Sequence, residues 1–406
     1  MGARFPRVAI GRRELAAAAL HLPLGHGLSR RLPGPYRVDP VVWLDEHPAT
    51  WQLAPAASAT SVGPTTPDGL RAEAAVPLPA VRGYRFRGGS VHPRSGAVVV
   101  EHGVVLERLG HVPAAECDYG SWACLAHRGR RGLTQRRAGP TLPRGFFLGG
   151  LGSFNYYHLM IELLPKLQHL ARLEQDTGPL PLLVDRTAAE VPSFRRAIEA
   201  LAPGHELVVL DADVLTRVGD LVLVNSPSLC AFNMREGVDP RPEHSFVRPE
   251  SLRWVADTLA QAPAQSTPTD GPRVFFRRAT SRRPYNEDAV FEVLQGYGFE
   301  GVEMAGLSLD EQVVLCRRAT AFAGPTGAEW TNLLFASPGV PALCWMASQM
   351  SGFAVYANLA AAVGVDLRYH LYDMAKANAS HLYQHSYRLD PHAIDRAAAA
   401  TFGARA

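Results

Sequence analysis

At the centre of the chain stand Asn155-Tyr156-Tyr157-His158-Leu159-Met160-Ile161-Glu162-Leu163-Leu164-Pro165, in which polar and aromatic side chains open an otherwise apolar helix. His158 and Glu162 are four residues apart, so on a helix their side chains point the same way, about one turn from each other. Burying such a pair costs free energy unless each group has a partner. The pair also follows the glycine run Gly149-Gly150-Leu151-Gly152. The stretch therefore predicts chemistry in a cleft at the start of a helix.

Short apolar strands alternate with helices on both sides of this stretch, from residue 145 to 261 and again after residue 272. Such alternation predicts an α/β fold with mostly parallel sheets and right-handed crossovers. We expect five parts: an N-terminal extension, partly irregular (1–80), a β-rich region (81–140), an N-terminal Rossmann-like domain (141–262), a C-terminal Rossmann-like domain (273–375) and a tail (376–406). Ala262–Pro272 is the predicted linker.

Helix starts are predicted from their capping residues. A helix is expected from Asn155 to Leu173, and Asn286 is predicted to cap a second one that ends near Tyr297. Ser308 and Glu311 form the pattern of a capping box, which predicts a third helix from Leu309 to Arg318.

The segment Gly324-Pro325-Thr326-Gly327-Ala328-Glu329-Trp330-Thr331-Asn332 follows a predicted buried strand and opens a helix. Thr326 is the expected N-cap and Glu329 its capping-box partner. Free N–H groups and the helix dipole at such a start attract an anion, and Gly327 leaves room for a phosphate. The alternative, that these residues only cap a helix and turn the chain, stays open.

Four arginines, Arg277, Arg278, Arg282 and Arg283, follow the first strand of the C-terminal unit. Ligands of an open α/β sheet bind at the carboxyl ends of its strands, where a guanidinium can hold a diphosphate. A solvated basic loop is the alternative reading.

Two nucleotide-site patterns are incomplete. Gly150 and Gly152 match the first half of G-x-G-x-x-G, but Asn155 stands where its last glycine is required, so a dinucleotide oxidoreductase using Asp185 on a ribose is disfavoured. Asp211-Ala212-Asp213 has the spacing of a metal-binding Asp-x-Asp but is expected on a surface turn.

Composition limits the functional classes. The 406 residues are 47% hydrophobic and 19% charged, which is typical of a globular protein, and the net charge of +3 is too small to indicate nucleic acid. Five scattered cysteines have no zinc-like spacing and favour a reduced, cytoplasmic protein. Leu15–Leu24 is too short and interrupted for a membrane span, so any membrane contact would be peripheral. The tail histidines His381, His385 and His392 fit no firm metal site.

Taken together, these segments resemble the family 61 glycosyltransferases, which include bacterial capsular-polysaccharide-type transferases and eukaryotic O-GlcNAc and xylan-decorating enzymes. The resemblance runs in order over about residues 82–370 and is densest from 273 to 345. The matching residues are Asn155-Tyr156-Tyr157-His158 with Glu162 and Pro165, Asn286-Glu287-Asp288, Gly298-Phe299-Glu300, Leu307-Ser308-Leu309 with Glu311-Gln312, Gly324-Pro325-Thr326-Gly327-Ala328, and Asn332-Leu333-Leu334-Phe335-Ala336 with Pro338-Gly339.

The resemblance implies a GT-B-like fold, with two Rossmann-like domains facing a cleft, and inverting transfer without an essential metal or other cofactor. By position it implies Glu162 as general base, and Arg277 or Arg278 as the group that neutralises the donor diphosphate. The implied donor-binding residues of the C-terminal domain are Gly324, Thr326, Gly327, Glu329 and Asn332. Many relatives have His in place of Thr326 and Ala-Gly or Ala-Ala in place of Ala328-Glu329, so we expect Glu329 to cap the helix or accept from ribose hydroxyls.

The leading hypothesis is a glycosyltransferase of polysaccharide biosynthesis that moves a hexose or pentose from a nucleotide sugar, a UDP-sugar by preference, to a hydroxyl of a glycan or other acceptor. His158 would orient Glu162 or the acceptor, which is expected near Asn155, Tyr156 and Tyr157. A catalytically silent glycan- or nucleotide-binding protein of the same fold is the alternative. The presence of both His158 and Glu162 speaks against it.

Overall fold

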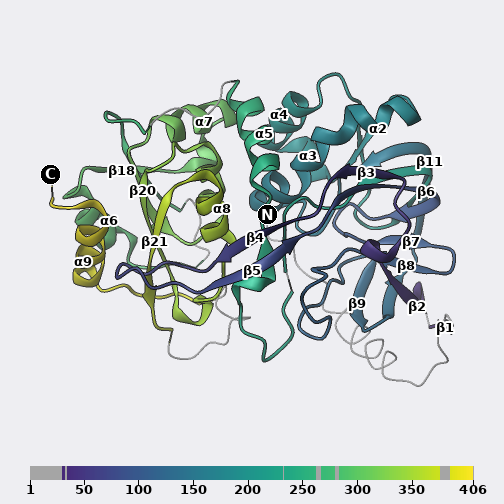
Figure 1. Cartoon of the computed structure of the whole chain (residues 1–406), viewed down its shortest axis with the longest axis horizontal. Coiled ribbons are helices and arrows are strands. Elements are labelled where there is room, and N and C mark those ends of the chain that lie inside the picture. The colour runs from purple at the N-terminus through teal and green to yellow at the C-terminus, as the bar shows by residue number, and fades with distance from the viewer. Residues whose placement is uncertain are drawn as a thin grey trace.

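The computed structural model describes residues 30–405 apart from 33, 232, 262–266, 279–282 and 375–384. It is a mixed α/β structure in which two lobes lie side by side (Figure 1). The C-terminal lobe begins at β17, and the N-terminal lobe contains most of the chain before it. The stretch Leu15–Leu24, the first half of the expected linker, Arg282 and His381 lie outside the described residues.

The C-terminal lobe is built on a five-stranded parallel sheet with the order β18-β17-β19-β20-β21. Its strands are β17 (Arg273–Phe276), β18 (Phe299–Val302), β19 (Ala321–Pro325), β20 (Pro341–Ala347) and β21 (Asp366–Tyr372). Its helices are α6 (Glu287–Gln295), η5 (Met304–Gly306), α7 (Leu309–Arg318), η6 (Ala328–Phe335), η7 (Ser348–Met350), α8 (Val355–Val363) and α9 (Pro391–Phe402). Alternate strand residues are buried on opposite faces, because side chains of a strand alternate. Phe275 belongs to the cluster with α6 and α9, whereas Phe276 belongs to the cluster with α7, η6 and α8.

The strand order of this sheet reverses between β17 and β19. The chain passes from β17 outward to β18 on one side and then returns to β19 on the other side. In open α/β sheets the carboxyl ends of the strands at such a point form the usual ligand crevice. The topology alone therefore predicts a ligand site at the residues that follow Phe276 and Pro325.

The N-terminal lobe contains a twelve-stranded sheet that begins with four parallel strands in the order β13-β12-β11-β14. These are β11 (Ala138–Phe147), β12 (Leu182–Val184), β13 (Leu207–Val209) and β14 (Leu215–Val224). The sheet continues from β14 through β6 (Val81–Val91), β7 (Val98–Val100), β8 (Gly103–Leu106), β2 (Tyr36–Trp43), β10 (Arg131–Gln135) and β9 (Cys124–Arg128), with β1 (Arg30–Arg31) on β2 and β3 (Trp51–Ala54) on β6. Here the order reverses between β11 and β14, which is the corresponding ligand position.

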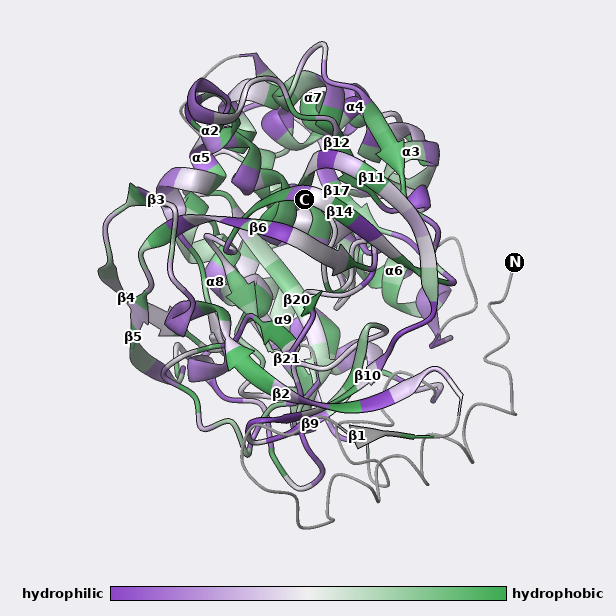
Figure 2. Cartoon of the chain, turned by 90° about the vertical axis from the view of Figure 1, so that its right-hand side faces the viewer, coloured by the Kyte–Doolittle hydropathy of each residue, from purple (hydrophilic) through white to green (hydrophobic). Residues whose placement is uncertain are grey.

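The remaining elements of this lobe cover and connect the sheet. They are η1 (Leu44–Glu46), η2 (His158–Leu163), η3 (Leu164–His169), α2 (Leu170–Thr177), α3 (Arg186–Glu190), α4 (Pro192–Leu201), β15 (Leu229–Cys230), η4 (Pro242–His244), β16 (Ser245–Phe246) and α5 (Pro249–Ala260). In Figure 2 hydrophilic segments gather on outer helices such as α2, as expected of helices with one buried face.

The predicted regular helix from Asn155 to Leu173 is wrong in detail. The segment is a π-helix from His158 to Leu163, a 3₁₀-helix from Leu164 to His169, and only then the α-helix α2. Pro165 explains the break, because proline lacks an N–H and its ring clashes with the carbonyl four residues earlier in an α-helix. Single π-helical turns are frequent at functional sites.

Of the other predicted helix starts, one is confirmed and one is wrong. Ser308 and Glu311 form the expected capping box of α7. Asn286 precedes α6, but its side chain makes no capping hydrogen bond. Its Nδ2 donates to the Leu389 carbonyl and its Oδ1 accepts from the Leu389 N–H, so it fastens the chain that precedes α9.

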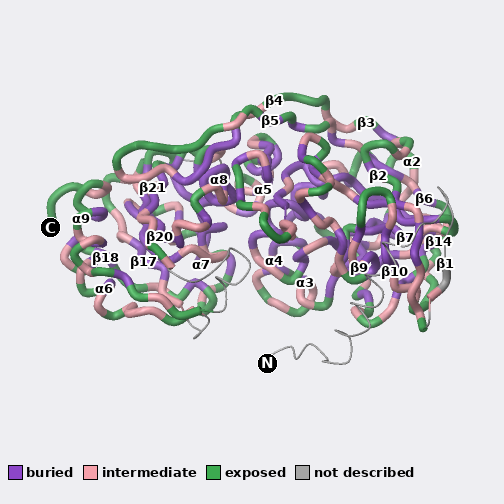
Figure 3. The backbone as a smooth tube through the Cα atoms, turned by 90° about the horizontal axis from the view of Figure 1, so that it is seen from below, coloured by how far each residue is buried: buried purple, intermediate pink, exposed green. Residues whose placement is uncertain are grey.

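A hairpin of β4 (Ala57–Val62) and β5 (Glu73–Leu78) crosses from the N-terminal lobe to the C-terminal lobe (Figure 1). Asn358 of α8 holds it, with Oδ1 accepting from Val62 N at 2.7 Å and Nδ2 donating to Ser61 Oγ at 2.8 Å. Thr65 beyond β4 pairs with Arg368 of β21. Figure 3 shows this hairpin as a largely exposed band over both lobes, below which one buried apolar cluster extends through the lobes. No helix in the described residues is long and apolar enough to span a bilayer.

Candidate active site

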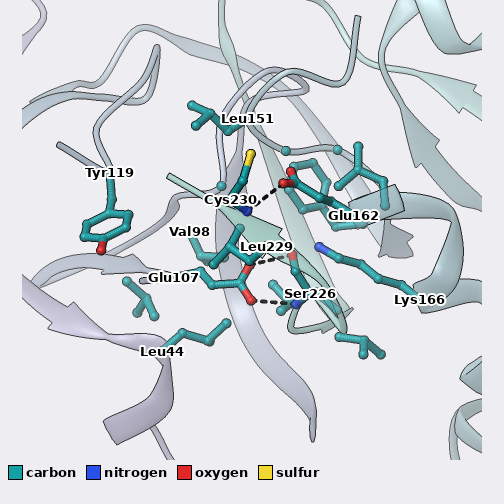
Figure 4. A pocket seen from close by; sticks show the side chains of 18 of the residues that line it. Leu44, Val98, Glu107, Tyr119, Leu151, Glu162, Lys166, Ser226, Leu229 and Cys230 are labelled. Atoms are coloured by element: carbon teal, nitrogen blue, oxygen red, sulfur yellow. Dashed lines mark hydrogen bonds between the residues drawn. The ribbon is translucent and has the colours of Figure 1, made fainter. Parts of the chain in front are cut away.

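A partly open cavity of about 60 Å³ lies in the N-terminal lobe where the strand order reverses (Figure 4). Its walls include the loop Gly149–Leu151 after β11 and the end of β14 at Val224. We call it the N-terminal cavity; its polar lining residues include Glu107, Glu162, Lys166 and Ser226. Since a water needs about 10–15 Å³ of such space, the cavity has room for about four waters. It can therefore take a hydroxyl or hydroxymethyl group of an acceptor.

Glu162 is fixed at the wall of this cavity by two hydrogen bonds. Its Oε2 lies 2.8 Å from Nδ1 of His158, and its Oε1 accepts from the backbone N–H of Cys230 at 2.8 Å. The exposed fractions are 4% for Glu162 and 7% for His158. The structure thus brings the two predicted catalytic residues together, and it holds the carboxylate in a single orientation beside a space that a hydroxyl can enter.

Lys166 extends into the same cavity between Glu162 and the Glu107–Ser226 pair (Figure 4). The lysine is 6% exposed, and no carboxylate oxygen of a described residue lies within 4.0 Å of its Nζ. Burial lowers the pKa of Lys166, although the carboxylates of Glu107 and Glu162 act in the opposite direction. An ammonium that is buried without an ion-pair partner indicates a functional position, because it is costly to retain otherwise.

Glu107 forms the far wall of the cavity. Its two carboxylate oxygens accept from the Ser226 N–H at 2.5 Å and from the Ser226 hydroxyl at 2.9 Å. Neither Glu107 nor Lys166 was identified as a site residue from the sequence. A signal for Lys166 did exist: it lies four residues after Glu162 and is one of only two lysines in an arginine-rich chain.

Three side chains at this place have the chemistry of metal ligands. Ligand atoms of His158, Glu162 and Cys230 all lie within 4.8 Å of one another. However, burial raises the pKa of the Cys230 thiol well above its usual value, with the Glu162 carboxylate acting in the same direction. Glu162 is also already hydrogen-bonded through both oxygens. As folded, the trio is a hydrogen-bonded cluster that would have to lose protons and open before holding an ion.

In the C-terminal lobe two guanidinium groups converge on the turn after β19. Arg278 Nη2 donates to the Thr326 carbonyl at 2.6 Å, and Arg283 Nη2 donates to the same oxygen at 3.2 Å. We call this group of Arg278, Arg283 and Thr326 the arginine turn. It lies at the carboxyl ends of β17 and β19, where the strand order reverses.

Arg277 points elsewhere. Its Nε donates to Glu287 at 2.9 Å, its Nη2 donates to Asp288 at 3.1 Å, and its guanidinium lies 5.3 Å from the ring centre of Phe291. These partners belong to α6, so Arg277 fastens that helix to β17. Neighbouring residues at a strand end point to opposite sides, which explains why only Arg278 reaches the turn.

The expected capping box at Thr326 and Glu329 is wrong. The 3₁₀-helix η6 starts after Gly327 and has no side-chain cap. Glu329 folds back over Gly327, so a Cβ at position 327 would displace the Glu329 carboxylate. Gly324 is the fourth residue of β19, and a Cβ on it would lie 2.9 Å from Cβ of Phe276.

The remaining predicted site residues lie where the two lobes pack together. The Tyr156 hydroxyl lies 3.0 Å from Asn332 Oδ1, and the Tyr157 ring packs edge-on against Tyr356 at 5.5 Å. Asn155 Oδ1 accepts from the Tyr157 N–H at 2.9 Å and so turns the chain into η2. Tyr156 and Asn332 thus contact each other, although we expected Tyr156 to contact the acceptor and Asn332 to contact the donor.

The aspartates of the two disfavoured nucleotide-site patterns have structural roles. Asp185 caps α3 by accepting from the Thr187 N–H and also binds Arg94 at 2.7 Å. Asp211 accepts from the Asp213 N–H on an exposed turn before β14, as expected.

The N-terminal cavity is lined by residues 44–230 and the pocket beside Thr326 by residues 283–372, so these two spaces are separate.

Comparison with known families assigns the class of protein. A sequence model of the family described as Glycosyltransferase 61 matches residues 156–343, a span that contains His158, Glu162 and Lys166 as well as the arginine turn. Residues 156–343 of the chain therefore match the glycosyltransferase 61 family, which confirms the resemblance seen in the sequence. No curated protein sequence matches the chain.

Proposed function

We propose that the protein transfers a sugar, with inversion, from a nucleotide sugar to a hydroxyl of a glycan. The observation that carries this proposal is the His158–Glu162 pair, held at 2.8 Å beside a cavity that admits a hydroxyl. A UDP-sugar is the donor that we favour, because the family resemblance points to it.

In the proposed reaction the acceptor hydroxyl enters the N-terminal cavity. Glu162 takes its proton while the oxygen attacks the anomeric carbon, and the bond from that carbon to the diphosphate oxygen breaks on the opposite face. His158 holds the carboxylate in place. Lys166 is placed to donate a hydrogen bond to the attacking oxygen, which stabilises the negative charge that develops there.

The arginine turn is the proposed site of the leaving diphosphate. Arg278 and Arg283 bring two permanent positive charges to a turn of the chain, and guanidinium groups bind phosphate oxygens in a bidentate way. These charges can offset those of the leaving group, so we propose that no metal is needed. Turnover in EDTA should then equal turnover with added Mg²⁺ or Mn²⁺.

A GT-B arrangement is proposed for the two lobes. Its support is that each lobe has a run of parallel strands whose order reverses at the candidate site. Transfer then requires the donor sugar to extend from the arginine turn to the N-terminal cavity. We also propose a reducing, cytoplasmic setting, supported by five buried cysteines with no disulfide between them.

A screen of nucleotide sugars tests the function. Thermal unfolding is measured with each nucleotide sugar, since a ligand of the folded state raises the melting temperature. Nucleotide release is then measured for each sugar that shifts it. We expect slow release without acceptor and faster release with the right glycan. A protein that binds nucleotide sugars and releases none would be a silent binder, and the proposal would be wrong.

A further inference from the structure

Two exposed aromatic side chains contact one arginine in chain segments that also line the N-terminal cavity. Trp122 is 39% exposed and Phe154 is 44% exposed. The guanidinium carbon of Arg94 lies 5.9 Å from the ring centre of Trp122 and 5.3 Å from that of Phe154. The other large apolar side chains exposed in the described residues, Val42, Leu70, Val209 and Val314, are aliphatic.

This group is rigidly mounted. Arg94 Nε binds the fully buried Asp185 at 2.7 Å, and the ring of His92 stacks on Trp122 at 5.3 Å with an interplanar angle of 10°. Trp122 has φ of 50°, a conformation that residues with a side chain seldom adopt. Such strain persists where surrounding contacts enforce it, and it is frequent at binding sites. An aromatic ring held this way in solvent is prepared for a ligand.

The same backbone segments line the cavity and carry the aromatic rings. Gly150 lines the cavity and donates to the Pro93 carbonyl at 3.0 Å, and Ser153 Oγ donates to the same oxygen. On the other side Tyr119 lines the cavity, and Ser121 Oγ donates to the Arg94 carbonyl at 2.8 Å. Trp122 follows Ser121 and Phe154 follows Ser153, so these hydrogen bonds hold both aromatic residues close in the chain to residues that line the cavity.

We propose that Trp122 and Phe154 form a stacking platform for a sugar ring of the glycan acceptor. A hydroxyl or hydroxymethyl group of the acceptor fits the cavity, and the rest of the glycan can then extend over the residues beside it. Sugar rings present apolar C–H faces that pack on aromatic rings. Arg94 Nη1 makes no hydrogen bond to another described residue, so it can donate to a ring hydroxyl. The inference rests on the proposed function, because it assigns the acceptor side of that reaction.

The test uses the full-length protein on an array of fluorescently labelled oligosaccharides. Wild type is compared with Trp122→Ala, Phe154→Ala and the double variant. Leu70→Ala is the control, because Leu70 is the most exposed of the large apolar side chains at 70% and lies in the loop between β4 and β5. We expect each single variant to bind its glycans about fivefold more weakly and the double variant at least tenfold more weakly. Leu70→Ala should bind as wild type does, and Trp122→Tyr should retain most of the affinity.

Several results would overturn the proposal. One is a double variant that binds glycans like wild type while its thermal unfolding is unchanged. Another is a wild type that binds no glycan, or binds phosphatidylglycerol vesicles through Trp122 instead. Nucleotide-sugar affinity should not differ among the variants. If glycans bind through the platform but no nucleotide sugar is consumed, the proposed function fails and the platform stands.

Discussion

The two lobes carry candidate sites at the same topological position but with different chemistry. In each, the site lies at the carboxyl ends of two neighbouring parallel strands where the order reverses, β11 and β14 in one lobe and β17 and β19 in the other. The N-terminal cavity holds groups that can gain or lose a proton, namely His158, Glu162 and Lys166. The arginine turn holds guanidinium groups, which stay charged at any working pH. Topology thus sets where each site lies, and the side chains set what it can do.

After the loss expected for Glu162 itself, the largest effect is expected from Lys166→Met, which removes the ammonium and keeps the length of the side chain. Because one hydrogen-bond donor to a developing charge is worth about 10²–10³ in rate, kcat should fall by about that factor while donor affinity stays unchanged. Steady-state kinetics and donor titration measure both. An unchanged kcat would remove Lys166 from the reaction.

The same variant should be more stable than wild type. The buried ammonium has no ion-pair partner within 4.0 Å among the described residues, so replacing it with an apolar side chain should raise the free energy of unfolding by about 1–3 kcal/mol. The pKa of Lys166 is lowered from its ordinary value of 10.5, so its unfavourable contribution is full below the folded-state pKa and vanishes above about 10.5. The gain from methionine should therefore disappear in alkaline buffer. A gain that is the same at all pH values would contradict this origin.

The neighbouring arginines give a matched pair of variants. Arg278→Ala should weaken binding of the donor nucleotide about 10–100-fold, because a hydrogen bond to a charged group is worth about 1.5–3 kcal/mol. Arg277→Ala should change it less than threefold, since its guanidinium is engaged by Glu287 and Asp288. Calorimetric titration with UDP compares them. The reverse ranking would move the diphosphate site to α6.

A smaller effect is expected from His169 of η3, which should make the free energy of unfolding fall in acid. Burial lowers the pKa of His169 from 6.5 to about 4, and the nearby Arg248 acts in the same direction. The neutral form is favoured in the fold, so this stability is present above pH 6.5 and is lost as the pH falls toward 4. Allowing for partial exposure, we expect a loss of about 1–2 kcal/mol. Urea unfolding from pH 7 to 4 should show it in wild type but not in His169→Gln; equal losses would refute the assignment.

The sequence predicts the elements of this fold better than its site. The apolar runs at β17 and β19 and the capping box at Ser308 are local patterns, and the structure confirms them. The sequence did not predict Lys166 and Glu107 as site residues, because they come together only through contacts between segments far apart in the chain. Asn286 failed as a cap for the same reason, since a distant carbonyl at Leu389 competes for its side chain.

The different positions of Arg277 and Arg278 are only partly predictable from the local sequence. Both follow a strand, and alternation along a strand puts them on opposite sides. Which of them reaches the turn at Thr326 depends on the position of α6 and of that turn, and only the structure supplies these.

The central claim is that Glu162 accepts the proton of the acceptor and takes no part in donor binding, whereas Arg278 binds the donor and takes no part in proton transfer. The most direct test measures kcat and donor dissociation constant for Glu162→Gln and Arg278→Ala side by side. We predict that Glu162→Gln lowers kcat by about 10²–10⁴ with donor binding unchanged, whereas Arg278→Ala mainly weakens donor binding. Wild-type turnover in Glu162→Gln, or equal losses of donor affinity in both variants, would contradict this division between the lobes.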